Sequence, residues 1–177
     1  MLPLEHMQDR RQFLTIAGVA LGLAPVVAWL ERADNAGPAD VAGRHFPVER
    51  TDEEWRAALK PEAYRVLRGH STERAFSSPL NTEKRAGTFA CAACGHALFA
   101  STTKYDSGTG WPSFWAPLPE AVGTTVDRTL FMVRTEVHCA QCGSHLGHLF
   151  PDGPRPTGQR YCMNSASLEL EKAADPA

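Results

Sequence analysis

The sequence lacks a strong charge of either sign. Its 177 residues carry 18 lysine and arginine side chains against 20 aspartate and glutamate side chains, a formal net charge of −2. This near-balance does not supply the basic field that nucleic-acid binding normally needs. No glycine-rich loop follows a predicted strand and opens a helix, which argues against a nucleotide or flavin cofactor. We therefore expect neither nucleic acid nor such a cofactor as a partner.

Cysteine is scarce, and its arrangement is the most informative feature of the composition. Four of the five cysteines form two Cys-x-x-Cys-Gly motifs, at Cys91, Cys94, Cys139 and Cys142. The fifth, Cys162, stands alone. An odd cysteine beside two matched pairs predicts four structural thiols and one reactive thiol.

The two matched pairs, called here the knuckles, predict a metal site. Two residues between ligands let both thiolates of a knuckle reach one ion, and the following glycine allows a tight turn. Four thiolates fill the coordination sphere of Zn²⁺ and leave no place for water, so the predicted zinc is structural. Two alternatives remain open: a pair of dithiol redox centres, or disulfides formed after export.

The N-terminal residues have the pattern of an export signal. Arg10 and Arg11 precede an uncharged stretch from Phe13 to Leu30, and the spelling resembles twin-arginine signals, which carry folded proteins across a membrane. We predict an export signal at 1–30, a linker at 31–45, the functional domain at 46–172 and a tail at 173–177. The expected location is the periplasm, with membrane contact only through the N-terminal segment. An uncleaved anchor facing the periplasm and a buried helix are the alternatives.

The domain is predicted to be mainly β, with two short helices at its start. Thr51 and Glu54 form a capping-box pattern that begins the first helix. The second helix is predicted from Pro61 to Arg68, with Gly69 as its C′ residue, and both helices are expected to pack on the surface. Short, often alternating segments follow, which predict antiparallel strands at Thr88–Cys91, Ala97–Ala100, Thr129–Thr135 and Ser167–Leu170.

The residues around Cys162 suggest how this thiol becomes reactive. Arg160, two positions away, would lie on the same side of a strand and lower the pKa of the thiol. Asn164, at the next position on that side, would orient a polar group of the substrate. The alternative for Cys162 is a small buried hydrophobic residue, and the local sequence alone does not decide.

Two further motifs contribute candidate residues. His145 and His148 are natural proton donors near neutral pH, although metal ligation or a place in the core are alternatives. Trp111 follows a glycine-rich turn and offers an aromatic wall to an apolar group, or belongs to the core. A zinc-ribbon binding module, a cysteine hydrolase and an electron relay through the knuckles remain rival functions.

Taken together, these motifs resemble the B-type methionine sulfoxide reductases, which act on the R epimer of the sulfoxide. The resemblance covers about Phe46 to Leu170. It is carried by runs at Tyr64–Arg68, Thr72–Glu73, Cys91–Gly95, Lys104–Phe114, Arg134–Val137, Cys139–Pro154 and Thr157–Leu168. The last two runs are highly specific.

The resemblance implies a role for each matching residue. Cys162 corresponds to the nucleophile, which becomes a sulfenic acid and is regenerated by a thioredoxin-like thiol. Trp111 and Phe114 correspond to substrate-binding residues. The polar active-site set is His145, His148, Asn164 and Arg160, and the knuckle cysteines correspond to zinc ligands. The implied fold has two antiparallel β-sheets in a β-tent-like arrangement, the substrate is oxidised methionine in proteins or peptides, and a monomer is expected.

The sequence departs from this family at one important position. Many members carry a resolving cysteine two residues before the tryptophan, whereas this chain has Thr109 there. An internal disulfide during turnover is therefore not expected, unless the zinc site donates a thiol.

Overall fold

The computed structural model describes residues 44–129 and 132–172. The predicted export signal at 1–30, all but the last two residues of the predicted linker, and the predicted tail at 173–177 lie outside the described residues. Within the described part of the chain, no helix combines the length and hydrophobicity needed to cross a bilayer.

Two short helices begin the described domain. Helix α2 (Asp52–Ala58) has the predicted capping box. Thr51 Oγ1 accepts a hydrogen bond from the Glu54 amide at 3.2 Å, and the Glu54 carboxylate accepts one from the Thr51 amide at 2.7 Å. Helix α3 (Pro61–Leu67) begins at a proline. Proline lacks an N–H, but the N–H of the first helical residue has no acceptor within the helix, so no hydrogen bond is lost. Local sequence signals thus account for both helix starts.

The helices contribute more to the core than a surface layer would. Trp55 of α2 and Leu67 of α3 are at most 2% exposed and belong to the hydrophobic core. Beyond α3, the positive φ falls on His70 (52°) rather than on Gly69. Gly69 is required for a different reason, because a Cβ there would lie 2.7 Å from the carbonyl oxygen of Arg65.

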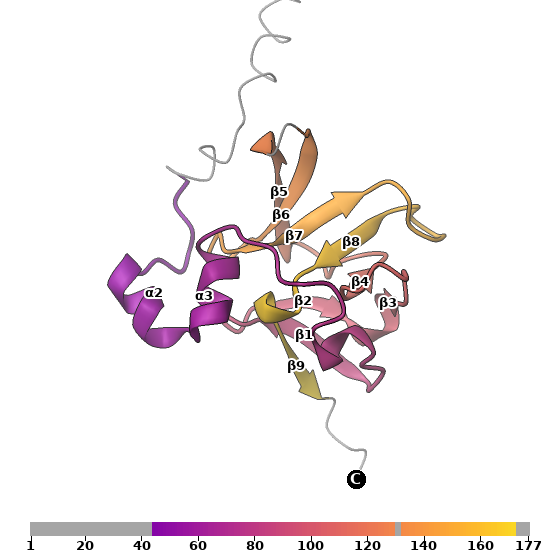
Figure 1. Cartoon of the computed structure of the whole chain (residues 1–177), viewed down its shortest axis with the longest axis horizontal. Helices are drawn as coiled ribbons and strands as arrows, with labels where there is room; N and C mark the ends of the chain where they lie inside the picture. Colours follow the sequence, from indigo (N-terminus) through magenta and orange to yellow (C-terminus); the bar gives the residue numbers. More distant parts are fainter. Residues whose placement is uncertain (1–43, 130–131, 173–177) are drawn as a thin grey trace, which may run out of the picture. The chain divides into compact units, whose positions relative to one another are not determined.

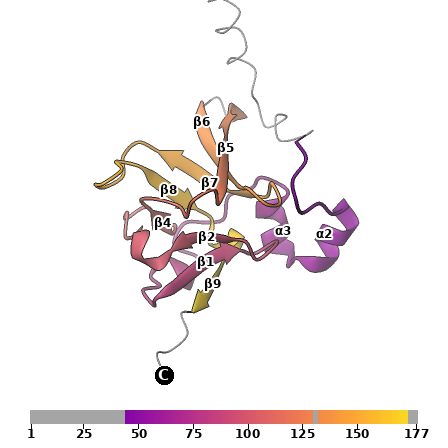
Figure 2. The ribbon, with the colours of Figure 1, turned by 180° about the vertical axis from the view of Figure 1, so that it is seen from behind.

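The described residues form nine strands in two antiparallel sheets, which confirms the implied fold. The smaller sheet has the order β2-β1-β9, with β1 at Gly87–Cys91, β2 at Ala97–Ala100 and β9 at Leu168–Lys172. Figures 1 and 2 show this sheet on one side of the larger sheet, with both helices at the same flank of the domain.

The larger sheet has six strands and carries the nucleophile. Its order is β3-β4-β8-β7-β6-β5. The strands are β3 (Lys104–Tyr105), β4 (Ser113–Phe114), β5 (Val122–Asp127), β6 (Arg134–Cys139), β7 (His145–Phe150) and β8 (Arg160–Met163).

The predicted strand at Thr129–Thr135 is confirmed only at its end. Strand β5 ends at Asp127 and β6 begins at Arg134, so only Arg134 and Thr135 of this stretch lie in a strand, and residues 130–131 lie outside the described residues. The Asp127 side chain explains the end of β5, because its Oδ1 accepts hydrogen bonds from the amide and the hydroxyl of Thr129, at 2.9 and 2.6 Å. A carboxylate that bonds to the backbone two residues on favours a turn over a strand.

Three phenylalanines from the two sheets form the centre of the core. Phe89 of β1, Phe99 of β2 and Phe114 of β4 have no exposed surface. The Phe99 and Phe114 rings stack with their centroids 4.3 Å apart, and Phe89 meets Phe114 edge-on at 5.0 Å. These contacts fix the short strand β4, which pairs with the strand that carries Cys162.

Candidate functional site

Cys162 lies in β8, between two strands that supply its polar neighbours. It is in register with Ser113 on β4 and with His148 on β7. Residues directly opposite in antiparallel strands project to the same face of the sheet, so the three side chains are neighbours. The Cys162 thiol is free and half-buried. It is therefore neither sealed in the core nor grouped with the knuckle cysteines.

A cavity of about 130 Å³ opens at Cys162. Trp111 forms part of its wall and is held in place by its indole N–H, which donates to the carbonyl oxygen of Glu73 at 3.3 Å. The other lining residues are Thr72, Arg134, Gly147, His148, Phe150, Met163 and Asn164. The structure thus brings four predicted site residues together around one small hollow: Cys162, Trp111, His148 and Asn164.

Asn164 joins the segments that surround this cavity. Its Oδ1 accepts a hydrogen bond from the Glu73 amide at 3.1 Å, and its Nδ2 donates to the carbonyl oxygen of Leu146 at 3.1 Å. The Glu73 carboxylate in turn accepts from the amides of Ser165 and Ala166. Because both ends of its amide are engaged and its exposure is only 4%, Asn164 positions the cavity wall.

A chain of hydroxyl groups ends at the nucleophile. Ser113 and Thr109 each lie within hydrogen-bond distance of the Ser107 hydroxyl, at 2.7 and 2.8 Å. Thr109 Oγ1 is 3.9 Å from the sulfur of Cys162. Thr109, at the position where the resemblance implies a resolving cysteine, therefore contacts the nucleophile and presents a hydroxyl to it.

The protonation of Cys162 differs from the sequence prediction. Burial raises the pKa of the Cys162 thiol above its ordinary value, although the Thr109 hydroxyl and the Arg160 charge both oppose this. Arg160 lowers the pKa as predicted, but it also forms a bidentate ion pair with Asp152, with both N–O distances 2.8 Å. Asp152 offsets part of the Arg160 charge. Burial therefore raises the pKa of Cys162 more than Arg160 lowers it.

This balance predicts how Cys162 responds to pH. Because the thiolate reacts and the pKa is raised, alkylation of Cys162 by iodoacetamide should increase about tenfold per pH unit through neutral pH. Arg160→Gln should raise the pKa further and slow alkylation at pH 8. The rate is measured by mass spectrometry of the Cys162 peptide. Arg65→Gln, on the exposed face of α3, is the matched control, and equal rates in both variants would contradict the role of Arg160.

His148 is the histidine beside the nucleophile. Its Nε2 lies 2.8 Å from Asp127 Oδ2, an oxygen that also contacts Arg134 at 2.6 Å. Burial lowers the pKa of His148, and the hydrogen bond to Asp127 opposes this shift. Burial alone would raise the pKa of Asp127, but bonds from Thr129 and His148 hold it below its usual range. The pair is thus a largely neutral imidazole backed by a carboxylate.

His145 lies one layer further from Cys162. It is 2% exposed, and its Nδ1 is 2.6 Å from Glu136 Oε1. Its ring meets that of His148 edge-on, with centroids 5.4 Å apart. His145 is absent from the lining of the Cys162 cavity and lines an adjacent one of about 440 Å³. His145 therefore contacts His148 but does not line the Cys162 cavity.

Phe114 does not contact the cavity, contrary to its expected role in substrate binding. It has no exposed surface and packs against Phe89 and Phe99 between the sheets. The aromatic residue that lines the cavity with Trp111 is Phe150, whose ring lies 4.3 Å from the Arg160 guanidinium carbon. The sequence held a signal for this, because Phe150 is two positions from His148 and so shares its face of β7.

The carboxylates that support the site were not predicted from the sequence. Asp127 and Glu136 lie in β5 and β6 and meet their histidines across strands. Asp152 meets Arg160 across the β7–β8 connection. Side chains alternate between the two faces of β6, so Glu136 shares a face with Arg134 and His138. Which residues of other strands they meet depends on the strand order. Only the assembled sheet shows these pairs.

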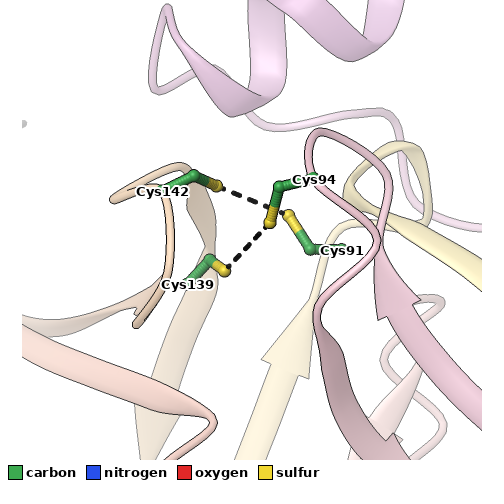
Figure 3. A group of neighbouring side chains, drawn as sticks. All are labelled: Cys91, Cys94, Cys139 and Cys142. Carbon is green, nitrogen blue, oxygen red and sulfur yellow. Dashed lines mark hydrogen bonds between the residues drawn. The ribbon is translucent and has the colours of Figure 1, made fainter. Parts of the chain in front are cut away.

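The knuckles lie at the ends of strands from different sheets. Cys91 ends β1 and Cys139 ends β6, and Figure 3 shows all four thiols converging from two facing turns. The four sulfur atoms lie within 4.8 Å of one another. Cys91 and Cys142 are 3.8 Å apart, and Cys94 and Cys139 are 3.7 Å apart. A tetrahedral zinc with Zn–S bonds of about 2.3 Å requires sulfur separations of about 3.8 Å.

The electrostatics of the cluster also favour a cation. Hydrogen bonding to Cys139 and then to Cys142 raises the pKa of Cys91, whereas hydrogen bonding to Cys139 lowers the pKa of Cys142. Four thiolates at these separations repel one another, and a bound cation offsets this repulsion. The turns are similar in both knuckles: Gly95 and Gly143 have φ values of 73° and 66°, as the motif predicted. The donor set and geometry fit a four-thiolate metal ion.

Comparison with known proteins agrees with this site. The SelR domain family matches residues 59–172. The peptide methionine sulfoxide reductase MsrB of Hahella chejuensis is 54% identical over 127 residues, which cover 71% of this chain and 91% of that protein. The MsrB of Thiobacillus denitrificans is 58% identical over 122 residues, 68% of this chain and 92% of that protein. The MsrB of Methanosarcina mazei is 53% identical over 129 residues, 72% and 92% respectively. The chain therefore belongs to the SelR-domain family of MsrB-type peptide methionine sulfoxide reductases.

Proposed function

We propose that this chain reduces the R epimer of methionine sulfoxide, in oxidised proteins or peptides, with Cys162 as the nucleophile. One observation carries the proposal: a free, half-buried thiol shares a cavity of about 130 Å³ with an indole wall and a carboxylate-backed imidazole. The names of the relatives, peptide methionine sulfoxide reductases, support reduction of methionine sulfoxide.

The cavity walls account for substrate orientation. Trp111 and Phe150 offer apolar surface to the methyl group of the sulfoxide, and His148 offers a polar group to its oxygen. The sulfoxide sulfur is a stereocentre. With its methyl group against the aromatic wall and its sulfur facing Cys162, only one epimer directs its oxygen towards His148.

The chemical step transfers oxygen from one sulfur to another. Because its pKa is raised, the Cys162 thiol carries its own proton, which His148 accepts as the cysteine sulfur attacks the sulfoxide sulfur. His148 then gives this proton to the sulfoxide oxygen. The oxygen leaves the substrate sulfur and ends on Cys162 as a sulfenic acid. Cys162 loses two electrons, the substrate sulfur gains two, and methionine leaves.

Regeneration requires a thiol from another molecule. A thioredoxin-like dithiol attacks the sulfenic sulfur, water leaves, and a mixed disulfide forms. The second thiol of the donor then breaks this disulfide and restores Cys162. Thr109 cannot take the role of a resolving thiol, so the donor reaches Cys162 directly.

A single turnover without reductant tests this scheme. Supplied with separated epimers, the protein should release one methionine per chain from the R sulfoxide and none from the S sulfoxide, leaving a sulfenic acid that a dimedone probe labels. Thr109→Cys should instead form a disulfide with Cys162, because the Thr109 hydroxyl oxygen is already 3.9 Å from that sulfur. Thr109→Ser is the matched control. Equal consumption of both epimers, or a disulfide in the wild type, would refute the scheme.

The four-cysteine site is proposed to hold structural zinc. Thiolate ligands and tetrahedral separations favour Zn²⁺, and a filled coordination sphere excludes a catalytic water. The knuckle residues would join the two sheets through the ion and leave Cys162 free for chemistry.

The proposed location is the periplasm, reached by the twin-arginine route. The Arg10-Arg11 motif and the uncharged stretch to Leu30 support this, and an N-terminal anchor facing the periplasm is the alternative. Export in the folded state would keep the knuckle thiols on their ion before they meet an oxidising compartment. The proposed role is repair of oxidised envelope proteins by a monomeric enzyme.

A further inference from the structure

The cavity next to the Cys162 site carries a second group of metal-binding side chains. His70 follows α3, Glu136 lies in β6 and His145 in β7, and all three line this cavity of about 440 Å³. One ligand atom from each lies within 4.8 Å of the other two. Both imidazoles contact the same carboxylate oxygen, Glu136 Oε1. The Nδ1 atom of His145 lies 2.6 Å from it and the Nδ1 atom of His70 lies 3.0 Å from it.

The charge of Glu136 makes this group attractive to a cation. Its side chain is only 3% exposed. Burial alone would raise the pKa of Glu136, but hydrogen bonds from His145, His70 and Thr125 hold it well below its usual range. The carboxylate is therefore a buried anion beside two imidazoles. Two imidazoles and one carboxylate form a donor set that binds Zn²⁺, Co²⁺ and Ni²⁺.

A second observation indicates an absent partner. The Nε2 atom of His145 is buried and has no hydrogen-bond partner among the described residues. Buried polar atoms normally have one. The adjoining cavity leaves space for the remaining coordination positions, and the His70 side chain, 38% exposed, provides an approach from solvent.

We propose that His70, Glu136 and His145 bind one divalent transition-metal ion, separate from the four-cysteine site. One nitrogen of each imidazole and a carboxylate oxygen supply three ligands, and the cavity supplies the open positions. An ion held there restrains His145 and, through its contact with His148, slows the reductase. This effect on activity rests on the proposed function, whereas the binding itself does not.

Metal stoichiometry tests the site directly. The full-length protein, purified without a histidine tag and with zinc on the knuckles, is dialysed against Co²⁺, and zinc and cobalt are counted by elemental analysis. Wild type should hold two ions per chain. His70→Gln should hold one and lose affinity for cobalt by about 100-fold or more. His45→Gln is the matched control, because His45 pairs with Glu49 at 3.1 Å on the exposed surface, and it should keep two ions.

The outcomes separate the metal site from the reductase proposal. A wild-type protein that retains one ion in excess cobalt, or a His70→Gln variant that binds cobalt as well as wild type, overturns the site. Thiolate-to-cobalt absorption with zinc loss and a total of one ion per chain also overturns it, because the cobalt then lies in the knuckles and the proposed site holds none. With thioredoxin as electron donor, cobalt should inhibit wild type but not His70→Gln. Binding without inhibition upholds the site and refutes the claim that the bound ion slows the reductase.

Discussion

Replacing Cys162 with serine should abolish reduction of methionine R-sulfoxide, with kcat/KM falling by about 10⁴-fold or more. A serine hydroxyl is a far weaker acid and a poorer nucleophile towards sulfur than a thiol, and its oxygen cannot take up a second oxygen as a sulfenic acid does. The substitution changes little else, because the Cys162 side chain is half-buried. Its sulfur makes only a loose contact with the Thr109 hydroxyl oxygen, at 3.9 Å. The assay supplies separated R and S sulfoxides with thioredoxin and measures the methionine released.

Stability measurements complete that experiment. The Cys162→Ser protein should keep the melting temperature and the metal content of wild type, which shows that activity alone is lost. Thr109→Ser, which keeps a hydroxyl beside the nucleophile, should retain most of the activity. A Cys162→Ser rate within tenfold of wild type would mean that another group performs the reaction.

Replacing Cys139 with serine should instead prevent folding. Cys139 has no exposed surface, and it holds one corner of the four-thiol cluster. A structural zinc site contributes on the order of 10 kcal/mol, whereas the net stability of a domain is about 5–15 kcal/mol. The loss of one ligand therefore removes most of the available stability. We expect insoluble protein with little bound metal, measured by the soluble fraction and elemental analysis.

The contrast between the two cysteine variants is the control. Both exchange one sulfur for oxygen, but only Cys139 belongs to the cluster that joins the sheets. A soluble Cys139→Ser protein that melts cooperatively within a few degrees of wild type would show that the ion is dispensable for folding.

Local signals in the sequence predicted much of the fold. The capping box at Thr51, the turn glycines at Gly95 and Gly143, and the strand at Ala97–Ala100 all depend on residues close together in the chain. The strand predicted at Thr129–Thr135 is confirmed only at its end, because apolar residues in this stretch resemble a strand, while the Asp127 side chain ends the ladder.

The chemistry of the site was predictable only in part. The nucleophile and its neighbours follow from motifs, and the structure gathers Cys162, Trp111 and His148 around one cavity. The raised pKa of Cys162 was not predictable, because desolvation depends on packing from several strands. Glu136, which backs His145, was missed for a similar reason, since a buried carboxylate finds its partner only in the finished sheet.

The division of the four thiols between the two sheets has a consequence for assembly. Cys94 and Cys139 are 45 positions apart, and neither knuckle alone completes a tetrahedron. Ion capture and closure of this long loop are therefore a single thermodynamic event. For the proposed zinc ion, the compartment that supplies it must also be the one in which the polypeptide folds. A chain translocated unfolded would have to bind the ion and close the loop on the far side of the membrane. A chain carried across folded arrives with the ion bound and the loop closed.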